Sequence, residues 1–261
     1  MTDKMLARKD GHIGTMTFNN PERHNAVSFD MWEKVGSILE DFRADPEIRV
    51  VIFTGAGGKA FVSGADISKF GDERGTLEAQ NKYNATTERI YQSIANFPKP
   101  TIAMIRGYCI GGGLGLAIAC DLRFATEGSK FALPAAKLGI GYGYLGLERF
   151  VATIGPSQTK DIFFSARQLD AAEALQIGLI NRIVPDADLE AVTTKYAETV
   201  GGNAPLTVTA VKHITTEIGK PESARNLDSC KAAVQACFKS ADFIEGRTAF
   251  MEKRKPQFKG K

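Results

Sequence analysis

The feature that most constrains this chain is an apolar run that ends close to three consecutive glycines. Residues 99–107 have the pattern of a strand buried on both faces, and Gly111, Gly112 and Gly113 precede the helical stretch LGLAIAC. Glycines at a helix start permit tight turns and close approach of a ligand to the backbone. Their N–H groups and the helix dipole stabilise negative charge developing on an oxygen atom. A packing turn without a ligand is the alternative that this segment alone leaves open.

Common nucleotide-binding and hydrolase motifs fail in detail. A P-loop ending at Gly58 and Lys59 would need glycine where Phe53 stands, and a Rossmann turn would need glycine at Leu116. A serine-hydrolase elbow around Ser63 fails because Phe61 replaces its first glycine. The glycine cluster therefore predicts a backbone site of another kind.

Strand-like and helical patterns alternate along the first part of the chain and helical patterns follow. An Asp-Gly pair at 10–11 predicts a hairpin of strands 4–9 and 12–18. Ser28 is the expected N-cap of a helix. This order predicts an α/β fold with a core over 1–200 and a helical region over 201–261. Further strands are predicted at 50–55 and 121–126, and helices at 28–45, 78–96, 156–165, 170–177, 186–200, 206–217 and 221–253, the last one broken.

Composition narrows the class of protein. With 261 residues, 43% hydrophobic and 24% charged, the chain is typical of a soluble globular enzyme, and its net charge of +3 predicts no nucleic-acid partner. We expect no signal peptide, no membrane span and a cytoplasmic location. The four cysteines are expected to be free thiols, and the three scattered histidines predict no metal site.

Five segments together resemble the motifs of the crotonase (enoyl-CoA hydratase/isomerase) superfamily, in order and at matching spacing. The resemblance implies a spiral of β-β-α units with a C-terminal helical trimerisation region. It implies an acyl-CoA thioester substrate, no cofactor beyond the coenzyme A of that substrate, and a homotrimer or dimer of trimers. The matching segments are 19–28, 59–67, 99–125, 166–185 and 249–258.

The resemblance also implies site residues. The backbone N–H groups of Ala65 and Gly112 are expected to hold the thioester oxygen as it becomes enolate-like. Phe250 and Lys253 of the tail are expected to close over the coenzyme, from this subunit or an adjacent one. The full set of implied coenzyme-binding residues is Arg23, His24, Ala26, Ser63, Ala65, Asp66, Ile67, Phe250 and Lys253.

Both carboxylates that hydratases of this superfamily carry are replaced here. One position is Gly115, inside a predicted helix, and the other is Ala135, after a proline. Hydration of a double bond requires water activation and proton delivery to carbon, which neither residue performs. Two interpretations of Gly115 are open: room for a bulky acyl group, or close packing against a strand.

Tyr142 matches a tyrosine of decarboxylase-like members, although those members have histidine where this chain has Ala65. Its hydroxyl is expected either to orient a substrate carboxylate or donate a proton, or to pack beside the pocket. Glu148 is expected at the surface, and Asp121 is expected to have a structural role.

These residues favour decarboxylase-like or other enolate chemistry over simple hydration, because loss of CO2 generates the enolate without a base. The chain is thus predicted to be a lyase or isomerase of the family. Two alternatives stay open: a non-catalytic acyl-CoA binding protein, and a CoA-thioester hydrolase assisted by Glu148 or Tyr142.

Overall fold

The computed structural model describes residues 3–69, 71 and 75–261. The strands are β1 (Met5–Asp10), β2 (Ile13–Phe18), β3 (Val50–Gly55), β4 (Ala60–Val62), β5 (Thr101–Ile105), β6 (Tyr108–Ile110), β7 (Leu122–Thr126), β8 (Lys130–Ala132), β9 (Leu169–Asp170) and β10 (Arg182–Val184). The helices are α1 (Phe29–Ala44), α3 (Leu77–Ala95), α4 (Gly112–Ala119), α5 (Ala135–Leu138), α6 (Tyr144–Ser165), α7 (Ala171–Gln176), α8 (Leu189–Gly201), α9 (Pro205–Ile218), α10 (Leu227–Lys239) and α11 (Ala241–Met251), with 3-10 turns η1 (Pro21–Arg23), η2 (Ile67–Lys69), η3 (Asp186–Asp188) and η4 (Glu222–Ala224).

The strands form two sheets. The larger has the order β1-β2-β3-β5-β7-β10, in which the β1–β2 hairpin is antiparallel and the other pairs are parallel. The smaller has the order β4-β6-β8-β9, parallel except for β9. In each of the successive strand pairs β3–β4, β5–β6 and β7–β8, the first strand belongs to the larger sheet and the second strand to the smaller one. One or more helices follow each pair. This repetition confirms the predicted spiral of β-β-α units.

Apolar spacing along α1 shows how the core forms. Apolar residues recur every three or four positions and therefore lie on one face of the helix, where all of them are buried as predicted: Met31, Trp32, Val35, Leu39 and Phe42. They join the main core cluster, to which β2, α3 and α4 also contribute. The N-cap lies at the predicted serine, but its hydroxyl donates to Asp30 Oδ1 and does not accept from a backbone N–H of the first turn, so the side chain does not cap the helix.

The helix predicted over 156–165 begins earlier, at Tyr144, and is interrupted at Gly155. Gly155 has a φ of +75°, a left-handed conformation that breaks the helix, and Pro156 restarts it because proline fits a first helical position. The predicted region therefore corresponds to the second half of α6.

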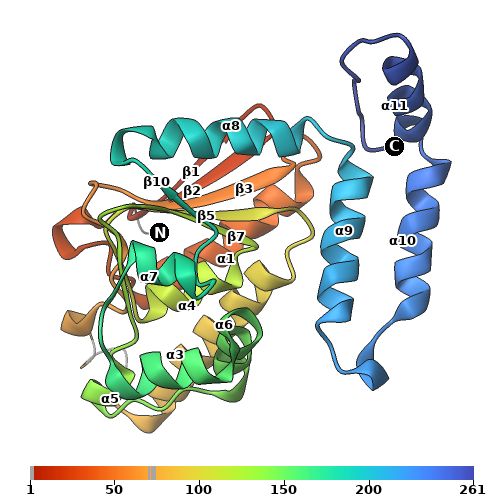
Figure 1. The fold of residues 1–261 in the computed structure, drawn as a ribbon. Coiled ribbons are helices and arrows are strands. Elements are labelled where there is room, and N and C mark those ends of the chain that lie inside the picture. The colour runs from red at the N-terminus through yellow and green to blue at the C-terminus, as the bar shows by residue number, and fades with distance from the viewer. Residues whose placement is uncertain (1–2, 70, 72–74) are drawn as a thin grey trace.

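The C-terminal helices are arranged in two ways. α8 covers one face of the larger sheet, where Val192, Tyr196 and Val200 pack against a second core cluster, whereas α9, α10 and α11 stand to one side of the sheets (Figure 1). The predicted break in 221–253 is confirmed, because α10 ends at Lys239 and α11 begins at Ala241. Within the described residues, no helix is long and apolar enough to cross a membrane.

Candidate active site

Two glycine loops, at 63–65 in a segment that matches the family motifs and at 111–113, lie against each other. β4 and β6 are parallel neighbours, and each strand ends just before one of the loops. A Cβ atom placed on Gly64 would lie 3.7 Å from the nitrogen of Gly112. Gly64 has a φ of +106° and Gly111 a φ of +55°, conformations that side chains rarely permit. The backbone conformation of both loops therefore favours glycine.

The backbone hydrogen bonds around residue 65 determine which way its amide faces. Val27 N donates to Gly64 O at 2.8 Å and Asp66 N donates to Val27 O at 3.0 Å, forming a parallel bridge centred on Ala65. The central residue of such a bridge directs its own N–H to the opposite side. Gly112 is the first residue of α4, where N–H groups have no intrahelical partner. Neither N–H is used by the bonds that hold these two elements together.

The predicted coenzyme-contacting residues near the N-terminus gather beside the Gly64 loop. Arg23 Nη1 donates to Ser68 Oγ at 2.5 Å and lies 3.4 Å from Asp66 Oδ1. Ser63 N donates to His24 O at 3.1 Å, and the Ser63 hydroxyl donates to Arg23 O at 3.3 Å. The structure thus brings together Arg23, His24, Ala26, Ser63 and Asp66.

Asn25, which the sequence reasoning missed, holds this turn in place. It is fully buried, and its Nδ2 donates to Ala60 O at 2.7 Å and to Ala56 O at 2.9 Å, while its Oδ1 accepts from Asn20 N at 2.9 Å. It and His24 both have left-handed φ angles, which asparagine tolerates better than most residues. A buried amide that satisfies three backbone groups explains why this turn can present Arg23 to the loop.

Asp66 stabilises the same loop as a carboxylate. Burial raises the pKa of this side chain, but hydrogen bonds from the Ser68 hydroxyl and N–H and the charge of Arg23 hold the pKa below its ordinary value of 3.8. A depressed folded-state pKa gives stability that is present above the unfolded pKa and is lost as the pH falls through the folded pKa.

We therefore expect Asp66→Asn to lower the free energy of unfolding by about 1 to 2 kcal/mol at neutral pH. Because wild-type Asp66 becomes protonated in acid, the difference between the two proteins should shrink as the pH is lowered from neutral to below 3.8, the ordinary pKa of the carboxyl. Urea unfolding of both proteins at the two pH values measures this. A difference that stays constant with pH would show that the charge of Asp66 does not matter.

Tyr91 of α3 is a further residue that the sequence reasoning missed. Its hydroxyl donates to Gly112 O at 2.7 Å. A Cβ atom on Gly115 would lie 3.1 Å from both the Cζ and the hydroxyl oxygen of Tyr91. Gly115 is therefore closely packed, as the second interpretation expected, but against an aromatic ring of helix α3 instead of a strand, and that ring occupies the space nearest to it. The sequence signalled Tyr91 only as part of a helical pattern.

Gly115→Ala should lower the free energy of unfolding by about 1 to 2 kcal/mol, because the new methyl group overpacks against Tyr91. This loss outweighs the gain in helix propensity of about 1 kcal/mol. With Tyr91→Leu as the background, we expect the sign to reverse. A double-mutant cycle in urea measures the coupling, and additive effects would contradict the contact.

Tyr142 lies in the same region as Tyr91. It is partly buried against the main core, and its ring centroid is 4.9 Å from that of Phe163 in an edge-on arrangement. Its charge is among the causes, after burial, that raise the pKa of Tyr91. The predicted packing contact is therefore present, and a functional role stays a prediction. Ala135 is buried at the start of α5, three residues after Ala132, whose carbonyl oxygen accepts from the N–H of the glycine turn.

Two other acidic residues lie as expected. Glu148 is exposed on α6. Asp121 Oδ2 accepts from Thr101 N at 2.7 Å and from Lys212 Nζ at 2.7 Å, which joins β5 to α9. Asp121 therefore has the structural role that was predicted.

The tail residues are not brought to this site within one chain. Phe250 is 82% exposed, and α11 lies far from α4 (Figure 1). Lys253 follows α11 and is also exposed. A contribution from an adjacent subunit stays a prediction. Ile67 begins η2, but its side chain lies outside the described part of the structure.

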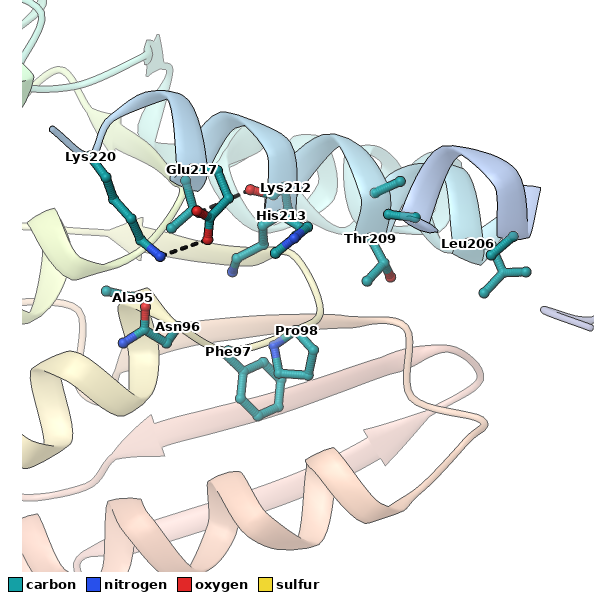
Figure 2. A pocket seen from close by; sticks show the side chains of 14 residues that line it. Ala95, Asn96, Phe97, Pro98, Leu206, Thr209, Lys212, His213, Glu217 and Lys220 are labelled. Carbon is teal, nitrogen blue, oxygen red and sulfur yellow. Dashed lines mark hydrogen bonds and ion pairs between the residues drawn. The ribbon is translucent and has the colours of Figure 1, made fainter. Parts of the chain in front are cut away.

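A separate cavity of about 400 Å³ lies between α9 and the connection from α3 to β5 (Figure 2). Its polar groups have structural partners: Glu217 accepts from Lys220 Nζ at 2.6 Å, and His213 Nε2 lies 2.8 Å from Ser229 Oγ. It shares no residue with the glycine loops. Among the residues that the structure describes, no group of three or more His, Cys, Asp or Glu side chains is placed to hold a metal ion.

The spiral of β-β-α units and its paired glycine loops define a crotonase-type protein. The family model described as enoyl-CoA hydratase/isomerase matches residues 8–261. The chain therefore belongs to the enoyl-CoA hydratase/isomerase family.

Proteins with known names agree with this assignment. The short-chain-enoyl-CoA hydratase of Clostridium acetobutylicum is 32% identical over 97% of this chain and 96% of its own. The carnitinyl-CoA dehydratase of Escherichia coli K12 is 33% identical over 100% of both chains. A crystal structure of an enoyl-CoA hydratase/carnithine racemase from Magnetospirillum magneticum has a TM-score of 0.93 and 33% identity, covering 100% of this chain and 97% of that one.

Proposed function

We propose that this protein binds an acyl-CoA thioester and polarises its carbonyl group with the backbone N–H groups of Ala65 and Gly112. The observation that carries the proposal is the contact of two glycine loops, in which neither N–H is used by neighbouring secondary structure among the residues that the structure describes. Fixed N–H dipoles stabilise a thioester enolate without reorganising, and one such donor contributes about 3 to 4 kcal/mol.

The coenzyme would extend from this site along the loop containing Ser63 and Asp66. Arg23 is half-exposed beside this loop and supplies a positive charge for a phosphate group. Because coenzyme A enters as part of the substrate, the proposal requires no separate cofactor.

The proposed chemistry forms a thioester enolate by loss of CO2 or by another C–C cleavage. In decarboxylation, the bond between the α-carbon and the substrate carboxylate breaks, and its electron pair moves into the thioester, where the two N–H groups stabilise the oxygen. The α-carbon then takes a proton either from Tyr142, whose phenolate regains a proton from solvent, or from water, which leaves hydroxide that solvent neutralises. No carboxylate base is needed, which suits Gly115 and Ala135.

Single-turnover assays with crotonyl-CoA, methylmalonyl-CoA and a broad panel of CoA esters test the function. Release of CO2 from a carboxylated ester supports the enolate mechanism. Binding without any turnover would contradict it in favour of a non-catalytic acyl-CoA binding protein, and release of free CoA would do so in favour of a thioester hydrolase.

We also propose that the chain forms a homotrimer or a dimer of trimers and acts in the cytoplasm. An apolar groove of about 560 Å³ lies among α9, α10 and α11, and Phe238 and Ile244 are exposed nearby. Burial of such surface drives association. Light scattering on the purified protein tests the assembly, and a monomer at micromolar concentration would contradict it.

A further inference from the structure

Tyr91 connects buried aromatic side chains of α1 and α3 to the glycine turn of α4. It is 9% exposed, and the Trp32 ring lies edge-on to it at a centroid distance of 5.5 Å. Trp32 is itself fixed, because its Nε1 donates to the Tyr83 hydroxyl at 2.9 Å. The phenol ring of Tyr91 thus packs against Trp32 of α1, and its hydroxyl donates to Gly112 O at 2.7 Å.

This hydrogen bond acts on the residue whose N–H is the proposed oxyanion donor. Gly112 lies between Gly111 and Gly113, and glycine gives the backbone more conformational freedom than any other residue. A tether on the carbonyl oxygen of Gly112 holds the peptide plane between Gly112 and Gly113, and with it the Cα atom from which the peptide plane of the Gly112 N–H extends. Such control matters because a misplacement of about 1 Å reduces catalysis by roughly 100-fold.

The Tyr91 hydroxyl is suited to this role because it stays protonated. Burial, followed by the charges of Tyr142, Tyr83 and Glu88, raises its pKa well above the ordinary value of 10.0. A neutral phenol donates to a carbonyl oxygen over the whole working range of pH and does not act as a base.

We infer that Tyr91 is a positioning residue: its hydroxyl fixes Gly112 so that the Gly112 N–H is held toward the thioester oxygen, and its ring closes the space beside Gly115. The inference rests on the proposed function. The ring of Tyr91 then occupies the side of α4 from which a carboxylate at position 115 would project in a hydratase of the family.

The test uses butyryl-CoA carrying 13C at the thioester carbonyl and difference infrared spectroscopy of the bound ester. Tyr91→Phe removes the hydroxyl and keeps the ring, and Tyr196→Phe makes the same change on α8, where Tyr196 packs against Phe124 away from the glycine turns, as the control. Wild type and Tyr196→Phe should lower the carbonyl frequency relative to free ester, whereas Tyr91→Phe should lower it by roughly half as much or less. The dissociation constant should change far less than the spectrum.

The outcomes distinguish failure of the proposed oxyanion hole from failure of the positioning role of Tyr91. If the wild type binds the ester without any frequency shift, the proposed oxyanion hole is wrong. If the wild type shows the shift and Tyr91→Phe retains all of it, the role of Tyr91 is wrong. Should Tyr91→Phe fail to fold, a fluorinated tyrosine introduced at position 91 keeps the ring and makes the hydroxyl a stronger donor. That protein should then lower the carbonyl frequency further, and an unchanged frequency would overturn the inference.

Discussion

Hydration of crotonyl-CoA by this protein is expected to be at least about 10,000-fold slower than by a hydratase that carries both carboxylates. Each proton-transfer group contributes roughly 100- to 10,000-fold, and two are missing at Gly115 and Ala135. Polarisation of the thioester by backbone N–H groups would remain, but it neither activates water nor delivers a proton to carbon. The loss should therefore appear in kcat more than in binding.

The disappearance of the enoyl thioester absorbance measures the rate. The short-chain-enoyl-CoA hydratase of Clostridium acetobutylicum, 32% identical to this chain, is a suitable reference assayed in parallel. A dissociation constant for the same ester, measured by calorimetry, separates a chemical defect from failure to bind. A rate within tenfold of the reference would refute the prediction.

Restoring the carboxylates alone should not restore hydration. Gly115→Glu places its side chain against the ring of Tyr91, which is buried against Trp32. We expect Gly115→Glu with Ala135→Glu alone to gain less than roughly tenfold in hydration, because the ring of Tyr91 occupies the space of the new side chain. Adding Tyr91→Leu frees that space but also removes the hydroxyl that holds Gly112, so the triple variant should exceed the double variant by less than the roughly 100-fold that a proton-transfer group contributes. A gain of roughly 100-fold without the change at Tyr91 would show that the ring moves aside freely.

Gly113→Ala should be the most damaging single methyl group in the glycine cluster. Its Cβ atom would lie 2.0 Å from Val62 O and 2.8 Å from Val62 Cβ. Backbone in a paired strand cannot move aside cheaply, so we expect the free energy of unfolding to fall by about 3 kcal/mol or more. Because β4 leads directly into the Gly64 loop, affinity for acyl-CoA should fall as well.

Gly128→Ala is the matched control, since no atom of the described chain, apart from Gly128 and its two neighbours in sequence, lies within 4 Å of the Cβ position in that turn. Its effect on unfolding should stay within about 0.5 kcal/mol. Urea unfolding of both variants, with tryptophan fluorescence from Trp32, makes the comparison. Equal unfolding midpoints for Gly113→Ala and wild type would show that α4 does not contact β4 as described.

Local sequence patterns were sufficient to predict most of the helices and strands. The hairpin, α1, β3, β7 and the break between α10 and α11 follow from turn residues and apolar periodicity, which act over a few positions. The early start of α6 did not follow, because Gly141 and Gly143 precede it and obscure its beginning. Propensity alone does not decide between a glycine-rich loop and a helix start.

The sequence by itself determined the fold class and the glycines at positions 64 and 111–113, and its resemblance to the family predicted that both carboxylates are replaced at positions 115 and 135. Those are statements about residue types at fixed spacing. Only the tertiary structure decided that Gly115 faces Tyr91, that Asn25 supports the turn holding Arg23, and that the tail is distant within one chain. These contacts join segments far apart in the chain, so they depend on how the helices pack and not on any local pattern.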